Sequence, residues 1–323
     1  MIRVTVAIPT YKRSTLLERA LLSALAQTFA GGMEVLVLEN PSEESLPGVP
    51  TFAERLCDSM ADTRLRYVRN ATNLGMVGNW NRCLDLARSQ WVIILHDDDW
   101  LSPHFLELAL ALTDANPELR LVGCKGIIER EGVEVRPDPR PTSSVKYLRI
   151  APFHILLGNP FLAPGVMMDK ETALALGGFD PDWFPTMDHM FWLRFCEAVP
   201  CARLQFPLLH YYIGNNASLQ SDILVRYILN DWKQRAQLLS RHYPKNRLLR
   251  LYSRIKVYRE HVFLEHLFKQ SLSYDELAEG LTKLGWRPVS IYLRWTYFPL
   301  RCVLETISIF FKSCTMKPVK LLK

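Results

Sequence analysis

Strand-like and helix-like segments alternate along the first 125 residues of this 323-residue chain. Apolar residues from Leu16 to Leu25 recur at helical spacing, and a second helical pattern covers Met76–Arg88. The strand-like runs are Val4–Ile8, which Pro9 is expected to close, then Glu34–Glu39, Leu65–Arg69 and the uninterrupted apolar run Trp91–Leu95. Strands that alternate with helices favour an α/β fold with a doubly wound, mostly parallel sheet flanked by helices.

The pattern changes near residue 119 and again near residue 220. Between residues 119 and 213, short strand-like pieces are mixed with short helices and a proline-rich stretch, and beyond Ser218 the chain is almost entirely helical by pattern. Residues 1–219 hold 20 Lys and Arg against 25 Asp and Glu, whereas residues 220–323 hold 19 against 8. We therefore expect an α/β domain over residues 1–219 and a basic, helical C-terminal region over residues 220–323.

The basic C-terminal region is compatible with several surroundings. Its charge fits nucleic acid or an anionic membrane surface, and a solvated helical face is the alternative. No run of about 18 apolar residues that would span a membrane is present. One helical face within 289–311 is apolar and would suit a helix in the membrane interface, or one packed on the α/β domain; it consists of Leu300, Val303, Leu304, Ile307, Phe310 and Phe311.

The seven cysteines are odd in number, widely spread and form no C-x-x-C pair. Neither a disulfide framework nor a zinc knuckle is therefore expected. The sequence enters a strand-like run at once, with no charged segment followed by a long apolar stretch. Cytoplasmic residence is the resulting expectation.

Three consecutive carboxylates, Asp97, Asp98 and Asp99, follow the buried-strand pattern in WVIILHDDDW. Carboxylates repel one another, and at the C-terminal end of a strand, where α/β sheets bind ligands, a divalent cation would neutralise them. A solvated turn with a helix cap is the alternative. Mg²⁺ or Mn²⁺ usually shares its ligands between carboxylates and substrate phosphates, which points to a nucleotide. Neither G-x-x-x-x-G-K-S/T nor G-x-G-x-x-G is present, so the metal and side chains would hold phosphate.

Six motifs, in order and spacing, resemble the family 2 inverting nucleotide-sugar glycosyltransferases, which have a GT-A fold. They are VAIPTYKRSTLLERALLSALAQTF, EVLVLENPS, NLGMVGNWN, ILHDDDWLSP, GGFDPDWFPTMDHMFWLRF and NNAS. The likeness covers about residues 1 to 220. It implies a GT-A domain over residues 1–219, followed by the helical extension.

The resemblance implies roles for the loops that follow the first strands. The loop after the first strand holds the nucleotide in this family, and here it presents Thr10, Tyr11 and Arg13. The second strand ends in an acidic pair that binds the base, and the NLG segment closes over the nucleotide; these positions are Glu39 and Asn40, and Asn73 and Gly75. Two departures stand out. Asn40 can donate as well as accept hydrogen bonds, so the choice of base is open, and Trp80 stands where many members carry Arg.

The family's D-x-D motif aligns with His96, Asp97 and Asp98. The resemblance therefore implies that Asp98 is the metal ligand and Asp97 a nearby support, with His96 in place of the first Asp. His96 could contact the ribose or the metal, or could be a hydrogen-bonded structural histidine. Asp99 is expected to cap the following turn.

A further carboxylate, Asp188, lies at the start of a predicted helix over Asp188–Ala198 and aligns with the family's catalytic base. An acceptor hydroxyl must lose its proton as it attacks the anomeric carbon, so a base is required. Simple helix capping is the alternative role, and the helix dipole would lower the pKa of Asp188 unless desolvation offsets it. Asp180, in GGFDPDW, is expected beside donor and acceptor, with Trp183 and Phe184 either on a sugar face or in the core.

The resulting expectation is an inverting transferase that moves a sugar from a nucleoside-diphosphate sugar to a hydroxyl, with Mn²⁺ or Mg²⁺. A glycan or lipid-linked saccharide acceptor in cell-surface polysaccharide or lipopolysaccharide synthesis would place the enzyme on the inner face of the membrane, with no nucleic-acid partner. A catalytically silent nucleotide-sugar binding module is an alternative, because His96 and Asn40 depart from the family pattern. A nucleotidyltransferase would carry a glycine-rich phosphate loop, and PTYKRST is no such loop.

Overall fold

The computed structural model describes residues 1–12, 15–43, 45–46, 48–141, 144–214, 221–247, 249–250, 253 and 316–320. The strands are β1 (Val4–Thr10), β2 (Met33–Glu39), β3 (Leu65–Arg69), β4 (Trp91–Ile94), β5 (Trp100–Leu101), β6 (Leu121–Arg130), β7 (Ser144–Ile150), β8 (Val166–Asp169), β9 (Cys201–Ile213) and β10 (Met316–Lys320). The α-helices are α1 (Thr15–Leu25), α2 (Phe52–Met60), α3 (Gly75–Leu86), α4 (Phe105–Ala115), α5 (Pro152–Leu157), α6 (Lys170–Ala175), α7 (Met187–Ala198) and α8 (Ser221–His242), with 3₁₀ turns η1 (Ala163–Gly165) and η2 (Pro181–Trp183).

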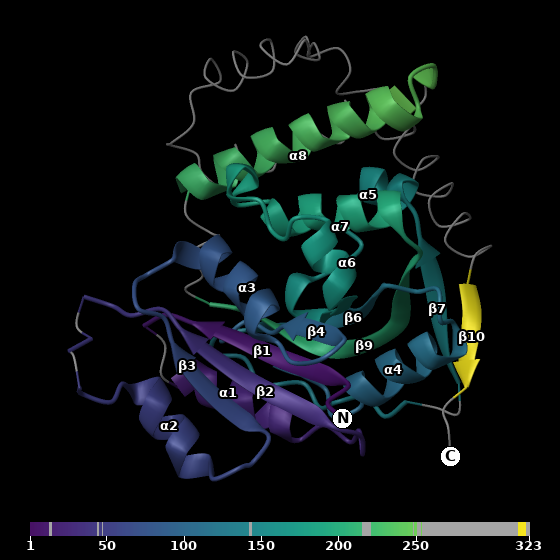
Figure 1. Ribbon diagram of the computed structural model, residues 1–323. Helices are drawn as coiled ribbons and strands as arrows, with labels where there is room; N and C mark the ends of the chain where they lie inside the picture. The colour runs from purple at the N-terminus through teal and green to yellow at the C-terminus, as the bar shows by residue number, and fades with distance from the viewer. Residues whose placement is uncertain are drawn as a thin grey trace.

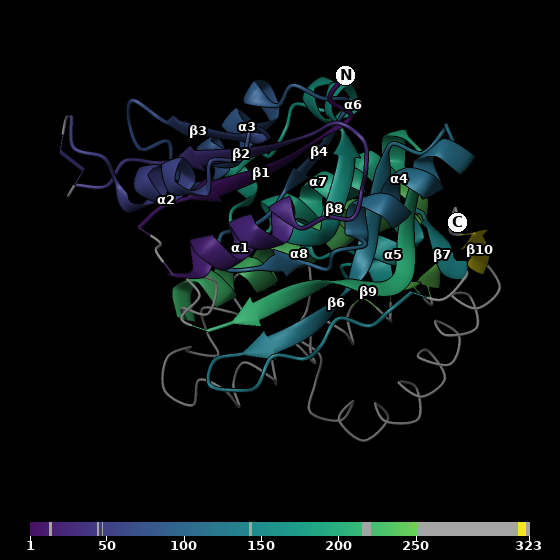
Figure 2. The ribbon, with the colours of Figure 1, turned by 90° about the horizontal axis from the view of Figure 1, so that it is seen from below.

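One sheet in the order β10-β7-β9-β6-β8-β4-β1-β2-β3 runs through the molecule, and β5 pairs with β9 (Figures 1 and 2). Strands β3, β2, β1 and β4 are parallel, and β1 lies between its two neighbours with Val6 opposite Val35 and Ile93. Each crossover between these strands contains a helix; α1 and α3 were predicted, and α2 was not. The predicted α/β architecture is confirmed in this half of the sheet.

Proline 9 does not close the first strand, because β1 continues to Thr10. The carbonyl of Ala7 accepts from Leu95 on the β4 side, whereas the carbonyl of Thr10 accepts from Asn40 on the β2 side. Since alternate residues of a strand face the same neighbour, Pro9 faces the β4 side, where pairing has ended after Ala7 and Ile94. No ladder hydrogen bond is lost at this proline.

The other half of the sheet is mixed. Strand β8 is antiparallel to both β4 and β6, β9 is parallel to β6, and β7 is antiparallel to β9. Strand β10 pairs antiparallel with β7, so Met316–Lys320 is extended in a region predicted to be almost entirely helical. Pro318 lies in this edge strand, the part of a sheet that tolerates proline.

Two apolar cores lie on the two faces of the sheet. Helices α1, α2 and α4 lie on one face and α3, α5, α6, α7 and α8 on the other (Figure 1). Their buried side chains form the two cores with those of the strands. Successive residues of a strand divide between the cores: Val6 and Ile8 of β1 point to the first, and Ala7 points to the second. The helices on both faces leave the carboxyl ends of the parallel strands as the place for a site.

Helix α8, the first part of the region predicted to be a basic helical extension, packs on α5 (Figure 1). It is joined to α7 by a hydrogen bond from the Gln234 side chain to the His189 carbonyl at 3.0 Å. Trp232, Leu238 and Leu239 are buried. Arg235 forms a buried ion pair with Asp231 at 2.6 Å. The apolar face within 289–311 lies outside the described residues. Among the described residues, no helix has both the length and the apolar character needed to cross a bilayer.

Candidate active site

A cavity of about 480 Å³ opens at the carboxyl ends of β1, β2 and β4. Five elements bring predicted residues to it, because parallel strands end at the same edge of a sheet. Of the predicted site residues, Thr10, Tyr11, Asn40, Asn73, Gly75, Asp97, Asp98 and Asp188 line this cavity. The structure thus brings together the acidic loop after β4, the first turn of α7 and the loop before α3.

The acidic loop after β4 is tied to two neighbouring elements. Asp97 accepts a hydrogen bond from the Thr10 hydroxyl at 2.7 Å, which links the loop to the end of β1. Arg19 of α1 donates to the backbone oxygen of Asp98 at 3.0 Å. The Arg19 guanidinium also lies over the Trp100 ring at 3.6 Å, and burial lowers its pKa. Arg19 therefore positions the loop, a role that sequence reasoning missed.

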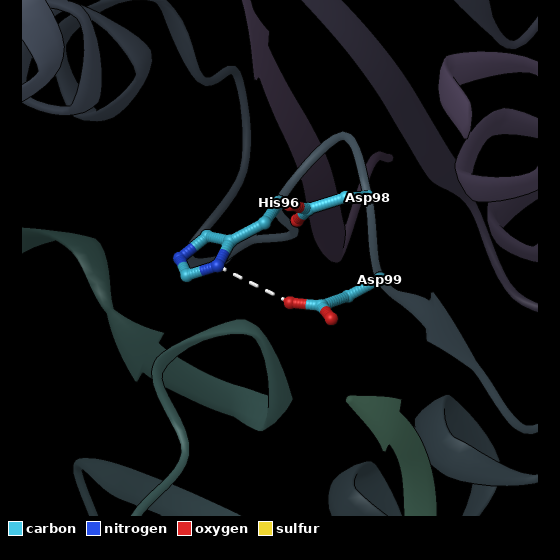
Figure 3. A group of neighbouring side chains, drawn as sticks. All are labelled: His96, Asp98 and Asp99. Atoms are coloured by element: carbon cyan, nitrogen blue, oxygen red, sulfur yellow. Dashed lines mark ion pairs between the residues drawn. The ribbon is translucent and has the colours of Figure 1, made fainter. Parts of the chain in front are cut away.

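Asp99 does not cap the following turn, so that prediction is wrong. Its Oδ1 accepts a hydrogen bond from the backbone N–H of Tyr212 at 2.7 Å. Its Oδ2 lies 3.2 Å from Nδ1 of His96 (Figure 3). Because β5 follows Asp99 directly and pairs with β9, the side chain meets β9 before any helix turn is available to it.

His96 lies between an aromatic ring and carboxylates. Its ring stacks on Trp80 with 4.9 Å between centroids, and Trp80 meets Phe179 edge-on. Burial acts to lower the pKa of His96, but the nearby carboxylates, of which Asp99 is the foremost, raise it above its usual value. Trp80 and His96, two of the three departures from the family pattern, are thus partners in one stack.

The acidic loop also offers a donor set for a divalent cation. Each of His96, Asp98 and Asp99 presents one ligand atom, and these atoms all lie within 4.8 Å of one another (Figure 3). Only 1% of Asp99 is exposed, and its Oδ2 is in an ion pair with His96. Carboxylate oxygens and an imidazole nitrogen are ligands that divalent cations take in proteins, so the donor types of these residues fit a cation.

Asp188 lies in the first turn of α7, two residues after the N-cap residue Thr186, and faces the same cavity. Burial raises the pKa of Asp188 above its usual value, against the opposing effects of the His189 backbone N–H and the His96 charge. Desolvation therefore outweighs those effects, as a base at this position requires.

The loop before α3 is fastened to the end of β2 through Asn40. Its Oδ1 accepts from Asn70 Nδ2 at 2.9 Å and from the Leu74 N–H at 3.2 Å, and its Nδ2 donates to the Gly75 carbonyl at 3.1 Å. Gly75 has a φ of 69°, which favours glycine. This network fixes the orientation of the Asn40 amide at the wall of the cavity.

Three predicted residues are not placed at the cavity. Glu39 accepts hydrogen bonds from Thr51 at 2.7 Å and from the Tyr67 hydroxyl, and it does not line the cavity. Asp180 caps η2 by accepting from the Asp182 N–H at 3.0 Å, also away from the cavity wall. Arg13 lies outside the described residues.

The aromatic pair after Asp180 is divided between core and cavity, and α8 adds residues that sequence reasoning missed. Trp183 is buried in the second core, whereas Phe184 lines the cavity. Ile223 and Tyr227 of α8 line it as well. Their spacing of four residues places them on one helical face, and that spacing is the only signal in the sequence that could have indicated them.

Asn81 of α3 holds the segment before Asp180. Its Nδ2 donates to the Phe179 carbonyl and its Oδ1 accepts from the Phe179 N–H, both at 2.8 Å. We expect Asn81→Ala to lower the free energy of unfolding by about 1–3 kcal/mol, because buried backbone groups lose their partners. Urea unfolding followed by circular dichroism measures this. The exposed neighbour Arg82 is the control: Arg82→Ala should cost under about 0.5 kcal/mol, and equal stability of the two variants would contradict the expectation.

Two solved structures resemble the whole described fold. The structure of TarS residues 1–349 from S. aureus in complex with UDP-GlcNAc has a TM-score of 0.60 at 15% identity, covering 88% of this chain and 80% of that one. The mannosyltransferase PcManGT from Pyrobaculum calidifontis, in complex with GDP-Man and Mn²⁺, has a TM-score of 0.53 at 17% identity, covering 93% and 82%. This likeness shows a GT-A glycosyltransferase fold.

Relatives in sequence point to the same family. An uncharacterized glycosyltransferase of Haemophilus influenzae is 23% identical over 60% of this chain, which spans only 62% of that relative's length. A GalNAc(5)-diNAcBac-PP-undecaprenol beta-1,3-glucosyltransferase of Campylobacter jejuni is 31% identical over 41% of this chain and 40% of its own length. The family model for glycosyl transferase family 2 matches residues 5–174, more than half of the chain. The chain therefore belongs to glycosyl transferase family 2.

Proposed function

We infer that this protein transfers a sugar from a nucleoside-diphosphate sugar to a hydroxyl group, with inversion at the anomeric carbon and with the aid of Mn²⁺ or Mg²⁺. One observation carries the inference: Asp98, after β4, and Asp188, in the first turn of α7, line one cavity although they are far apart in the sequence. A cation-binding carboxylate and a base on two sides of one cavity are the two groups that a single displacement needs.

The chemistry follows from the protonation state of Asp188. As a carboxylate it takes the proton of the acceptor hydroxyl, whose oxygen forms a bond to the anomeric carbon while the bond from that carbon to the diphosphate oxygen breaks. The bonding electrons leave with the diphosphate. A bound cation would offset the negative charge that builds on this leaving group. Asp98 would hold the cation, with Asp97 and Thr10 beside it.

The residues around Asn40 fit the nucleoside end of such a donor. Asn40, Asn73 and Gly75 line the cavity at the ends of β2 and of the loop before α3. Tyr11 is 40% exposed there, so its ring is available for stacking on a base. Two structural neighbours carry UDP-GlcNAc and GDP-Man, which supports a nucleotide-sugar donor without selecting the base.

A glycan or lipid-linked saccharide is the proposed acceptor, in cell-surface polysaccharide or lipopolysaccharide synthesis. The name of the Campylobacter jejuni relative specifies an undecaprenol-linked acceptor, and a Rhizobium meliloti relative is named a succinoglycan biosynthesis protein. The basic excess of residues 220–323 would favour a peripheral position on an anionic membrane surface, and we propose the inner face of the cell membrane.

A panel of UDP, GDP, CDP and dTDP sugars, each with and without Mn²⁺, tests the proposed function by thermal stabilisation. At a hundred times its dissociation constant, a donor adds about 2.7 kcal/mol to the stability of the folded state. We expect one donor class to stabilise the protein, and only when Mn²⁺ is present. Free monosaccharides are the control, and a protein that no donor stabilises with the metal would contradict the proposal.

A further inference from the structure

We propose that His96 supplies a nitrogen ligand to the divalent cation, together with the carboxylates of Asp98 and Asp99, and that this donor set selects transition metals over Mg²⁺. The inference rests on the proposed function, because it concerns the cation of the same site. It differs from the family pattern, in which an Asp stands at the position of His96. The three side chains belong to one short loop after β4.

The spacing of the His96 and Asp99 ligand atoms is that of neighbouring positions around a metal ion. Two ligand atoms that each lie about 2.1 Å from a cation, at an angle of 90°, are about 3 Å apart. Nδ1 of His96 and Oδ2 of Asp99 are 3.2 Å apart, and Asp98 offers a ligand atom within 4.8 Å of one from each of the other two residues, so its side chain must move closer to share the cation. Figure 3 shows Nδ1 as the ring nitrogen turned toward the carboxylates, with Nε2 turned away.

His96 and Asp99 form an ion pair, with Nδ1 of His96 3.2 Å from Oδ2 of Asp99. The other oxygen of Asp99 accepts a hydrogen bond from the Tyr212 N–H at 2.7 Å, which fixes the carboxylate in place. A buried carboxylate held beside an imidazole nitrogen can exchange this direct contact for a cation that both side chains bind.

The His96 ring is equally fixed. Trp80 stacks on it at 4.9 Å, and Phe179 in turn contacts Trp80 edge-on at 5.1 Å. Packing of this kind restricts the ring to one orientation. Nε2 of His96 is buried with no hydrogen-bond partner among the described residues, so the stacked rings are its support. The aromatic Trp80, which replaces the Arg of many family members, therefore supports the imidazole that replaces the Asp.

The donor types determine the metal preference. Mg²⁺ favours oxygen ligands in near-ideal octahedral geometry, whereas imidazole nitrogen suits first-row transition metals. With one nitrogen and two carboxylates, affinity should rise from Mn²⁺ to Co²⁺, with Mg²⁺ weaker than both. Replacement of the nitrogen by oxygen, in His96→Asp, should remove most of this discrimination.

Pulsed electron paramagnetic resonance of the full chain loaded with Mn²⁺ tests the nitrogen ligand directly. We expect a ¹⁴N coupling of a directly bound nitrogen, which changes to a ¹⁵N coupling when the protein is made with ¹⁵N-histidine. His96→Gln and His96→Asp should lose the coupling. His104→Gln should keep it, because His104 lies at the start of α4 and pairs with Glu107. Bound Mn²⁺ without nitrogen coupling in the wild-type protein would overturn the inference, and so would a coupling that survives in both His96 variants.

A competition between Mn²⁺ and Mg²⁺ measures the selectivity in the absence of nucleotide. The selectivity is the dissociation constant for Mg²⁺ divided by that for Mn²⁺. We expect this ratio to fall about tenfold or more in His96→Asp relative to the wild type. An unchanged ratio would overturn the selectivity. These outcomes are separate from the proposed function: a donor that binds with Mn²⁺ but without nitrogen coupling removes His96 from the ligands and leaves the transferase intact, whereas failure of every donor removes the transferase.

Discussion

Asp188→Asn should lower turnover about 10²- to 10⁴-fold while the protein still binds its donor. This loss corresponds to about 3–5 kcal/mol of activation free energy, the contribution of a positioned general base. The amide fills the same place in the first turn of α7 but cannot take the proton of the acceptor hydroxyl. Initial rates with the donor and acceptor measure turnover, and Mn²⁺-dependent thermal stabilisation measures donor binding.

Asp182→Asn is the matched control for this experiment. Asp182 is exposed, lies in η2 six residues before Asp188, and is not part of the cavity wall. It should retain wild-type turnover. If the turnover of Asp188→Asn equalled that of Asp182→Asn, Asp188 would have no part in the reaction. If Asp188→Asn lost donor binding together with turnover, Asp188 would act in donor binding and the assignment as base would fail.

Asp98→Asn should abolish metal-dependent donor binding. The substitution keeps the shape of the side chain but removes the negative charge that a hard divalent cation requires. Under conditions in which the donor adds about 2.7 kcal/mol to the wild type, the Mn²⁺-dependent part of that increment should disappear. Isothermal titration of the donor with and without Mn²⁺ measures the effect.

A carboxylate away from the cavity is the control for Asp98. Asp85 is exposed on α3 and does not line the cavity. Asp85→Asn should bind donor and metal as the wild type does. Donor binding by Asp98→Asn that still responds fully to Mn²⁺ would place the cation elsewhere. Unfolding curves of both variants establish that each is folded before binding is compared.

Most of the parallel half of the fold could be predicted because β1, β2 and β4 are short apolar runs and helical patterns fill the first and third crossovers. The exact end of β1 could not, since the rule that proline ends a strand depends on whether a partner needs the missing N–H. At Pro9 no partner does. The extended segment Met316–Lys320 was also missed, because its pairing partner β7 lies far away in the sequence.

The family resemblance predicted site roles for Asp98, Asp188, Glu39 and Asp180, but only Asp98 and Asp188 line the cavity. Glu39 is the last residue of β2, and its side chain is engaged by Thr51 and Tyr67, while the next residue, Asn40, meets the cavity. Asp180 is taken up by the cap of η2. In both cases local hydrogen bonds hold the carboxylate away from the cavity. The sequence alone does not distinguish such a carboxylate from one that lines the cavity.

Contacts between segments far apart in the sequence account for the remaining features that could not be predicted. The bond from the Tyr212 N–H to Asp99 joins residues that are 113 positions apart, and nothing in WVIILHDDDW indicates it. Likewise, an amphipathic helix such as α8 has the same pattern whether it covers α7, a membrane or a partner. Asn230 of α8 donates to the carbonyls of Trp183 and Phe184, both at 3.1 Å, so α8 fastens the loop that leads into α7.

The division of the cavity between two stretches of chain has a consequence for engineering. The loops after β1, β2 and β4 supply one group of lining residues, and the η2–α7 segment with α8 supplies another. Random libraries confined to Phe184, Ile223 and Tyr227 would leave the first group unchanged. Under the proposed function, such libraries would vary residues near Asp188 while the residues proposed to bind the nucleotide stay as they are in the parent chain.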